Sequence, residues 1–133
     1  ALDVDSYAEA TGLVEVLGET VEVYKVGSQL FTREGPRMIA YLAERRKRCF
    51  LDLKFHDIPN TVARAVAAAG ALPGVMMVTL HTAGGEERLR AAAAVPAGDR
   101  AGALGGVFEA AKKPGLEIAG AGAAVVPATA VGG

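Results

Sequence analysis

Residues 51–61 decide how the rest of this chain is interpreted. They read Leu51-Asp52-Leu53-Lys54-Phe55-His56-Asp57-Ile58-Pro59-Asn60-Thr61. The run from Cys49 to Phe55 has the composition of a buried strand, yet it carries two charges two residues apart. Side chains two apart on a strand point to the same face, so Asp52 and Lys54 are expected to project together, away from the apolar residues that alternate with them.

A charged pair in such a strand needs an explanation. Burying either charge alone is very costly, and burying both is tolerable only when they pair. A structural ion pair at a strand end is one explanation, since such pairs also perturb ionisation without performing chemistry. A third charge, Asp57, follows three residues after Lys54 and shortly before Pro59. The pattern Asp-x-Lys-x-x-Asp at a strand-to-helix turn therefore favours a chemical role.

A strand-like run followed by a segment of helical periodicity recurs four times in the first 94 residues. The predicted strands are Leu2–Val4, Val21–Val26, Cys49–Leu53 and Val75–Leu80, and the predicted helices are Ser6–Leu17, Pro36–Arg48, Asn60–Ala71 and Glu86–Ala94. Ser6 suits an N-cap, and Pro36 and Pro59 lie where the first turn of a helix accepts proline. Alternating strands and helices predict parallel βαβ units, which make either half of an eight-stranded barrel or most of a small doubly wound sheet.

Ionisable residues at the strand ends decide between these two folds. Asp3, Lys25, the pair Asp52 and Lys54, and His81 each fall at the carboxyl end of one predicted strand. A TIM barrel builds its sites on that rim, whereas a doubly wound sheet concentrates its site at one crevice. The sequence has no G-x-G-x-x-G after a strand and no P-loop, so a nucleotide-cofactor fold has no direct support. We therefore predict an α/β fold of the TIM (β/α)8 barrel type.

The length of 133 residues indicates one domain, residues 1–133, but a barrel of this type usually needs about 250 residues. The sequence is thus expected to cover about the first half of the barrel. From Ala91 onward it is rich in Ala and Gly, and only Val107–Phe108, Leu116–Ile118 and Val125–Val126 look like core. Residues 95–133 are expected to be poorly defined or incompletely recorded. In the latter case the structure should hold more than four parallel strands.

The bulk composition excludes several classes of partner. The chain is 51% hydrophobic with a formal net charge of −1, which gives no reason to expect nucleic acid or a charged membrane surface. The single cysteine, Cys49, fits a reducing cytosol, and no signal peptide or spanning apolar stretch is present. The basic run Arg45–Arg48 is expected to be a solvated helix end. Thr82–Gly85 could cradle an anion at a helix start, although a plain βα loop is the more common explanation of such a Gly-Gly turn.

Residues 51–61 resemble the central motif of the orotidine 5′-phosphate decarboxylase family. Ala1–Asp3, Tyr24–Gly27 and Leu80–Gly85 fall in the order and spacing of that family, so the resemblance covers residues 1 to about 94. Beyond Ala94 the match ends, and the family's Pro-Gly-Ile-Arg segment that grips the phosphate is not found. The resemblance implies a TIM-barrel homodimer in the cytoplasm, with its two active sites at the subunit interface.

The resemblance also implies a role for each matching residue. Asp52 and Lys54 match the central catalytic pair, and Asp57 matches an aspartate given to the neighbouring subunit's site. Asp3 and Lys25 match positions that hold the ribose hydroxyls and extend the charge network. Ile58 and Thr61 match residues that accompany Asp57 across the interface. His81 matches a position near the site, where a core histidine or one supporting the site from behind is an equal alternative.

The family reaction removes CO2 from C6 of orotidine monophosphate and leaves uridine monophosphate, a step of pyrimidine biosynthesis. Lys54 is the evident proton donor, and neither a metal nor another cofactor is expected. A magnesium-dependent sugar-phosphate decarboxylase or synthase of the same superfamily shares Asp-x-Lys-x-x-Asp and is the closest alternative. A catalytically silent ligand-binding or structural protein is a second, because the phosphate-gripping segment is missing.

Overall fold

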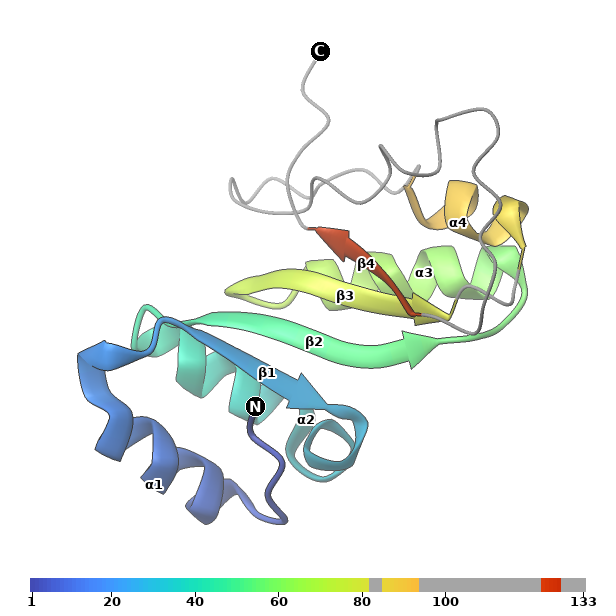
Figure 1. The fold of residues 1–133 in the computed structure, drawn as a ribbon. Helices are drawn as coiled ribbons and strands as arrows, with labels where there is room; N and C mark the ends of the chain where they lie inside the picture. Colours follow the sequence, from blue (N-terminus) through green and yellow to red (C-terminus); the bar gives the residue numbers. More distant parts are fainter. Residues whose placement is uncertain (82–84, 94–122, 128–133) are drawn as a thin grey trace.

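The computed structural model describes residues 1–81, 85–93 and 123–127 (Figure 1). Its elements follow in the order α1 (Tyr7–Leu17), a 3₁₀ turn η1 (Gly18–Thr20), β1 (Val23–Gly27), α2 (Ser28–Glu44), β2 (Arg48–Phe55), α3 (Pro59–Gly70), β3 (Val75–His81), α4 (Glu86–Ala93) and β4 (Ala123–Pro127). Strand and helix alternate as far as α4, so the predicted βα units are present in the described part of the chain.

The four strands form one sheet in the order β1-β2-β3-β4 (Figure 1). Strands β1, β2 and β3 run parallel, as βαβ units require. Strand β4 instead runs antiparallel to β3, with His81 opposite Ala123 and Met77 opposite Pro127. The expectation of more than four parallel strands is therefore wrong for the described residues, which contain three.

Local sequence accounts for where the helices begin. The Ser6 side chain accepts a hydrogen bond from the backbone N–H of Glu9 at 3.2 Å, which is the N-cap that the sequence predicts for α1. The Ser6 hydroxyl in turn donates to the Glu9 carboxylate at 3.1 Å, and the same carboxylate accepts from the backbone N–H of Asp5 at 3.1 Å. Helix α3 begins at Pro59, where the missing N–H costs no hydrogen bond.

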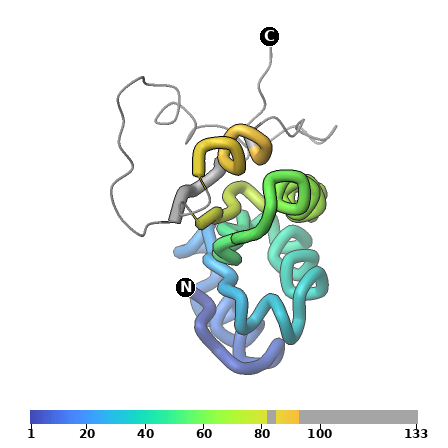
Figure 2. The backbone as a smooth tube through the Cα atoms, turned by 90° about the vertical axis from the view of Figure 1, so that its right-hand side faces the viewer, coloured from blue at the N-terminus to red at the C-terminus, as the bar shows by residue number. Residues whose placement is uncertain are grey.

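Helices α2 and α3 cover one face of the sheet, behind it in Figure 1 and to one side of it in the turned view of Figure 2. The strands bury alternate apolar side chains against these helices, among them Val26, Leu51 and Val78, which are fully buried. Leu53 and Phe55 point to this same side, where they line an apolar groove of about 330 Å³ with residues of α2 and α3. The alternate positions of the strands thus belong to the opposite face, where the charged residues lie.

One predicted strand and one predicted helix start are wrong. Leu2–Val4 is not a strand, although Leu2 is buried and its N–H donates to the Lys25 carbonyl at 2.9 Å. The segment lies beside the edge of β1 without forming a ladder. The second helix begins at Ser28 rather than Pro36, because a kink at Gly35, with φ of 25°, joins an earlier helical stretch to the part that Pro36 opens. Such a left-handed backbone suits glycine, so the local signal marked a kink and not a helix start.

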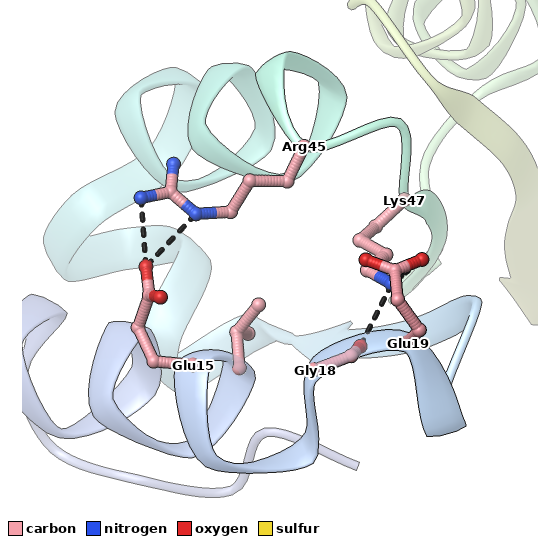
Figure 3. Close-up of a pocket in the computed structure, with 6 residues that line it drawn as sticks. Glu15, Gly18, Glu19, Arg45 and Lys47 are labelled. Carbon is pink, nitrogen blue, oxygen red and sulfur yellow. Dashed lines mark hydrogen bonds and ion pairs between the residues drawn. The ribbon is translucent and has the colours of Figure 1, made fainter.

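In the basic run Arg45–Arg48 the three arginines are exposed, as expected of a solvated helix end, whereas Lys47 is buried. Helix α2 ends at Glu44, and Lys47 is 5% exposed. Its ammonium donates to the Gly18 carbonyl at 2.8 Å and lies 3.4 Å from the Glu19 carboxylate (Figure 3). Lys47 therefore ties the end of α1 to the start of β2. This contact lies at the amino end of the strands, opposite the rim where the sequence places the site.

Several predictions concern residues outside the described ranges. The first three residues of the predicted anion cradle Thr82–Gly85 fall there, as do the core runs Val107–Phe108 and Leu116–Ile118. The run Val125–Val126 lies within β4. No helix in the described part of the chain is long and apolar enough to cross a membrane.

Candidate active site

The carboxyl ends of β1 and β2 bring two lysines onto one carboxylate. The Lys54 ammonium lies 2.7 Å from Oδ1 of Asp52, and the Lys25 ammonium lies 3.7 Å from Oδ2. Both lysines thus contact the same carboxylate through different oxygens. Lys25 reaches Asp52 from the neighbouring strand because Gly27, at the end of β1, stands opposite Asp52 in the parallel register.

Asp3 extends this arrangement from the N-terminal segment. Its Oδ1 lies 3.4 Å from the Lys25 ammonium, and its side chain is 68% exposed. The four side chains therefore alternate in sign, in the order Asp3, Lys25, Asp52 and Lys54. Exposure of Asp3 leaves its carboxylate available to a ligand, whereas Asp52, with a side chain 14% exposed, is enclosed by its partners.

The ionisation of Asp52 reflects this enclosure. Burial alone would raise the pKa of Asp52, but the hydrogen bonds from Lys54 and Thr79 and the charges of Lys54 and Lys25 outweigh burial and lower that pKa. Asp52 is therefore ionised at neutral pH and holds a fixed negative charge beside Lys54. The Lys54 ammonium thus lies 2.7 Å from a carboxylate that stays negatively charged.

Strand β2 is irregular where it carries the site. Leu51 pairs with Val78 and Phe55 pairs with Leu80, so three residues of β2 lie opposite the single residue Thr79. Within this bulge Lys54 has a φ of 48°, a left-handed conformation that is uncommon outside glycine. Bulges of this kind re-aim side chains beside functional sites. Here the bulge leaves Asp52 and Lys54 in contact, as the strand pattern predicted, although the ladder between them is interrupted.

Asp57, Ile58 and Thr61 lie apart from this cluster. Asp57 is exposed and accepts a hydrogen bond from the N–H of Ile58 at 2.6 Å, within its own turn. Ile58 is 63% exposed, and Thr61 on α3 is also exposed. The single chain therefore brings Asp3, Lys25, Asp52 and Lys54 together but does not add the three residues that follow β2.

Two residues at this rim were not singled out from the sequence as part of the site. Thr79 on β3 is 2% exposed and hydrogen-bonds both to Asp52 and to the backbone of Lys54. A polar residue inside an otherwise apolar strand was the available signal. His56 stacks on His81, with ring centroids 4.7 Å apart and planes 18° apart. His81 thus lies at the same rim, on the strand next to the Asp52–Lys54 pair.

Parallel strands covered by helices, with an ionised cluster at their carboxyl ends, define a protein of the (β/α)-barrel class whose site uses charge. The model of the orotidine 5′-phosphate decarboxylase / HUMPS family matches residues 1–124. The chain belongs to this family.

Individual relatives agree with the family model. Orotidine 5′-phosphate decarboxylases of Nostoc sp. and Carboxydothermus hydrogenoformans are each 51% identical over 92 residues, which cover 69% of this chain and 38% of either relative. The crystal structure of orotidine 5′-phosphate decarboxylase from Lactobacillus acidophilus matches with a TM-score of 0.63 and 37% identity, over 73% of this chain and 46% of that one. The fold is that of a TIM barrel, and the chain spans less than half the length of these relatives.

Proposed function

We propose that this chain carries the charged part of an active site that decarboxylates orotidine monophosphate to uridine monophosphate. The observation that supports it most is the Lys54 ammonium held at 2.7 Å by Asp52, with Lys25 and Asp3 beside it. Membership of a family named for this reaction supports the same substrate.

Lys54 is the proposed catalytic acid. Loss of CO2 from C6 of the pyrimidine ring leaves an electron pair on that carbon, with no cofactor in the proposal to accept it. An ammonium held beside C6 stabilises this charge as it develops and then gives its proton to the carbon. Asp52 contacts the Lys54 ammonium at 2.7 Å and orients it. A fixed carboxylate near the substrate carboxylate also disfavours the bound substrate more than the state in which CO2 has left.

Substrate binding is assigned to the residues around this pair. The exposed carboxylate of Asp3 and the ammonium of Lys25 suit hydrogen bonds to the ribose hydroxyls. Ile58 and Thr61 would contact the nucleotide together with Asp57. These three residues are exposed and apart from the cluster in the single chain, which supports their assignment to the site of a neighbouring subunit in a homodimer. The proposal places the enzyme in the cytoplasm, as one barrel domain that includes residues 1–133.

Turnover of orotidine monophosphate tests the reaction. Purified protein should form uridine monophosphate and CO2, and Lys54→Ala should lower turnover by far more than tenfold without changing the circular dichroism spectrum. Arg64→Ala removes an exposed cation from α3 and serves as the matched control, with turnover expected to stay near wild type. If Lys54→Ala kept more than about a tenth of wild-type turnover, equivalent to about 1.4 kcal/mol in the barrier, Lys54 would not be the proton donor.

Subunit mixing tests the shared site. Lys54→Ala and Asp57→Ala proteins should each be inactive, yet an equal mixture should recover roughly a quarter of wild-type turnover, because half the dimers are mixed and each holds one intact site. No recovery after verified subunit exchange would place Asp57 in its own subunit's site or outside the chemistry.

A magnesium-dependent sugar-phosphate enzyme is the second candidate, since the family model also covers the HUMPS group. Chelation by EDTA separates the two: the proposed metal-free decarboxylase should keep its turnover, and the sugar-phosphate enzyme should lose it until magnesium is restored. A silent binding protein would bind the nucleotide in calorimetry and form no product.

A further inference from the structure

Thr79, on β3, contacts both parts of the central pair. Its hydroxyl donates to Oδ1 of Asp52 at 2.8 Å and accepts from the backbone N–H of Lys54 at 2.8 Å. The Lys54 ammonium donates to the same Oδ1 at 2.7 Å. The contacts therefore close a ring that runs from the Lys54 backbone through Thr79 and Asp52 to the Lys54 side chain.

The bulge explains why this hydroxyl is needed. Because three residues of β2 stand opposite Thr79, the ladder between Leu51 and Phe55 is interrupted. A backbone N–H that is left without a strand partner costs free energy unless another acceptor replaces the lost carbonyl. For the Lys54 N–H, the Thr79 hydroxyl is that acceptor. Lys54 is also the residue of β2 whose positive φ of 48° costs conformational free energy.

The same hydroxyl decides how the Asp52 carboxylate is turned. With Thr79 and Lys54 both donating to Oδ1, the second oxygen is left to face Lys25. A hydroxyl has one proton to donate. The Thr79 hydroxyl donates it to Asp52, and a lone pair of the same oxygen accepts the hydrogen bond from the Lys54 N–H. Linked hydrogen bonds of this kind strengthen one another in a buried setting, and Thr79 is 2% exposed.

We propose that Thr79 is a positioning residue, whose buried hydroxyl fixes the β2 bulge at Lys54 and turns Asp52 toward the Lys54 ammonium. Its consequence for turnover rests on the proposed decarboxylase function, whereas its effect on Asp52 and Lys54 does not. Thr79 touches no reacting atom in this proposal and acts through the two charged residues.

Thr79→Val keeps the branched shape and removes the hydroxyl, and Thr79→Ser keeps the hydroxyl and removes the methyl group. In the valine variant, carbon-13 NMR should show a higher pKa for Asp52, and the Lys54 amide should exchange with solvent at least about tenfold faster. The Val26 amide on β1 reports global opening and should change much less. The serine variant should behave as wild type in both measurements.

Thr11→Val is the matched control, because the Thr11 hydroxyl also has a protein partner, the Ala8 carbonyl, but lies on α1. It should leave Asp52 and the Lys54 amide unchanged. The proposal is overturned if Thr79→Val leaves both readouts unchanged, or if Thr79→Ser shifts them as much as valine does. If the valine variant does not fold, wild-type protein supplies the test: the Thr79 hydroxyl proton should be protected and close to the Lys54 amide, and an unprotected hydroxyl would overturn the proposal.

The turnover assay then separates the two proposals. Thr79→Val should lower kcat about tenfold or more with KM within about threefold, and serine should restore it, because a small misplacement of a reacting group lowers the rate at an unchanged affinity. NMR shifts in a protein that never forms uridine monophosphate would sustain the positioning role and defeat the decarboxylase. Full turnover in Thr79→Val would remove the catalytic part of the positioning role and leave the decarboxylase standing.

Discussion

Replacing Lys47 by methionine should destabilise the fold by about 1–2 kcal/mol. Lys47 is 5% exposed, and its ammonium donates to the Gly18 carbonyl at the end of α1 (Figure 3). A hydrogen bond to a charged group contributes about 1.5–3 kcal/mol. Part of this is offset because the variant no longer buries an ammonium. Methionine keeps the apolar stem, so the remaining loss is that of the bond to Gly18, together with a small contribution from the ion pair with the exposed Glu19.

Arg48→Met is the matched control for this change. Arg48 is the next residue and also pairs with a glutamate, Glu22, but both side chains are more than half exposed. Its substitution should alter the free energy of unfolding by less than about 0.5 kcal/mol. Urea unfolding followed by circular dichroism measures both variants at equal protein concentration. Equal midpoints for Lys47→Met and Arg48→Met would refute the reasoning, since burial of the ammonium would then make no difference.

The remaining predictions concern ionisation and packing. Hydrogen bonds and charges that outweigh burial lower the pKa of Asp52, so its share of stability is present above the ordinary aspartate pKa and lost as pH falls through the lower folded value; Asp52→Asn should flatten this acid limb in unfolding curves measured against pH. Burial and then the hydrogen bond to Glu15 raise the pKa of Tyr41 to about 12, so wild type should lose about 2 kcal/mol of stability between pH 10 and 12 that Tyr41→Phe does not lose. A variant that loses as much would contradict the assignment. Met38→Ala, at a fully buried position of α2, should cost about 2–5 kcal/mol in the same assay, and a cost below 1 kcal/mol would show that the core collapses around it.

The parts of the fold that depend on neighbours along the chain could be predicted from the sequence. Ser6 and Pro59 mark the starts of α1 and α3. The alternation of residues in the strand predicted that Asp52 and Lys54 lie together, and they are in contact. Helix α3 was predicted to within one residue at each end. These features follow from local backbone preferences and from side-chain periodicity, both of which depend only on short stretches of sequence.

The parts that depend on contacts across the fold could not be predicted. Leu2–Val4 has strand composition, but a strand also needs a ladder, and among the described residues the segment makes a single backbone hydrogen bond to β1. The bulge at Lys54 breaks the assumption of one residue per ladder step, and only the register with β3 reveals it. The sequence pattern placed Lys47 among the cations of a helix end. Its partner, the Gly18 carbonyl, belongs to the end of another helix, so no local pattern could reveal the bond.

The antiparallel strand β4 has a consequence for how the molecule assembles. Short connections join β1 to β2 and β2 to β3, whereas a much longer connection, from His81 to Ala123, separates β3 from β4. Because this connection is about twice as long as the one between β1 and β2, closing it costs about 0.6 kcal/mol more chain entropy. We therefore expect β4 to pair last during folding and to separate first during unfolding. While β4 is separated, the backbone N–H and C=O groups along that edge of β3 have lost their partners and can accept a strand from a second molecule.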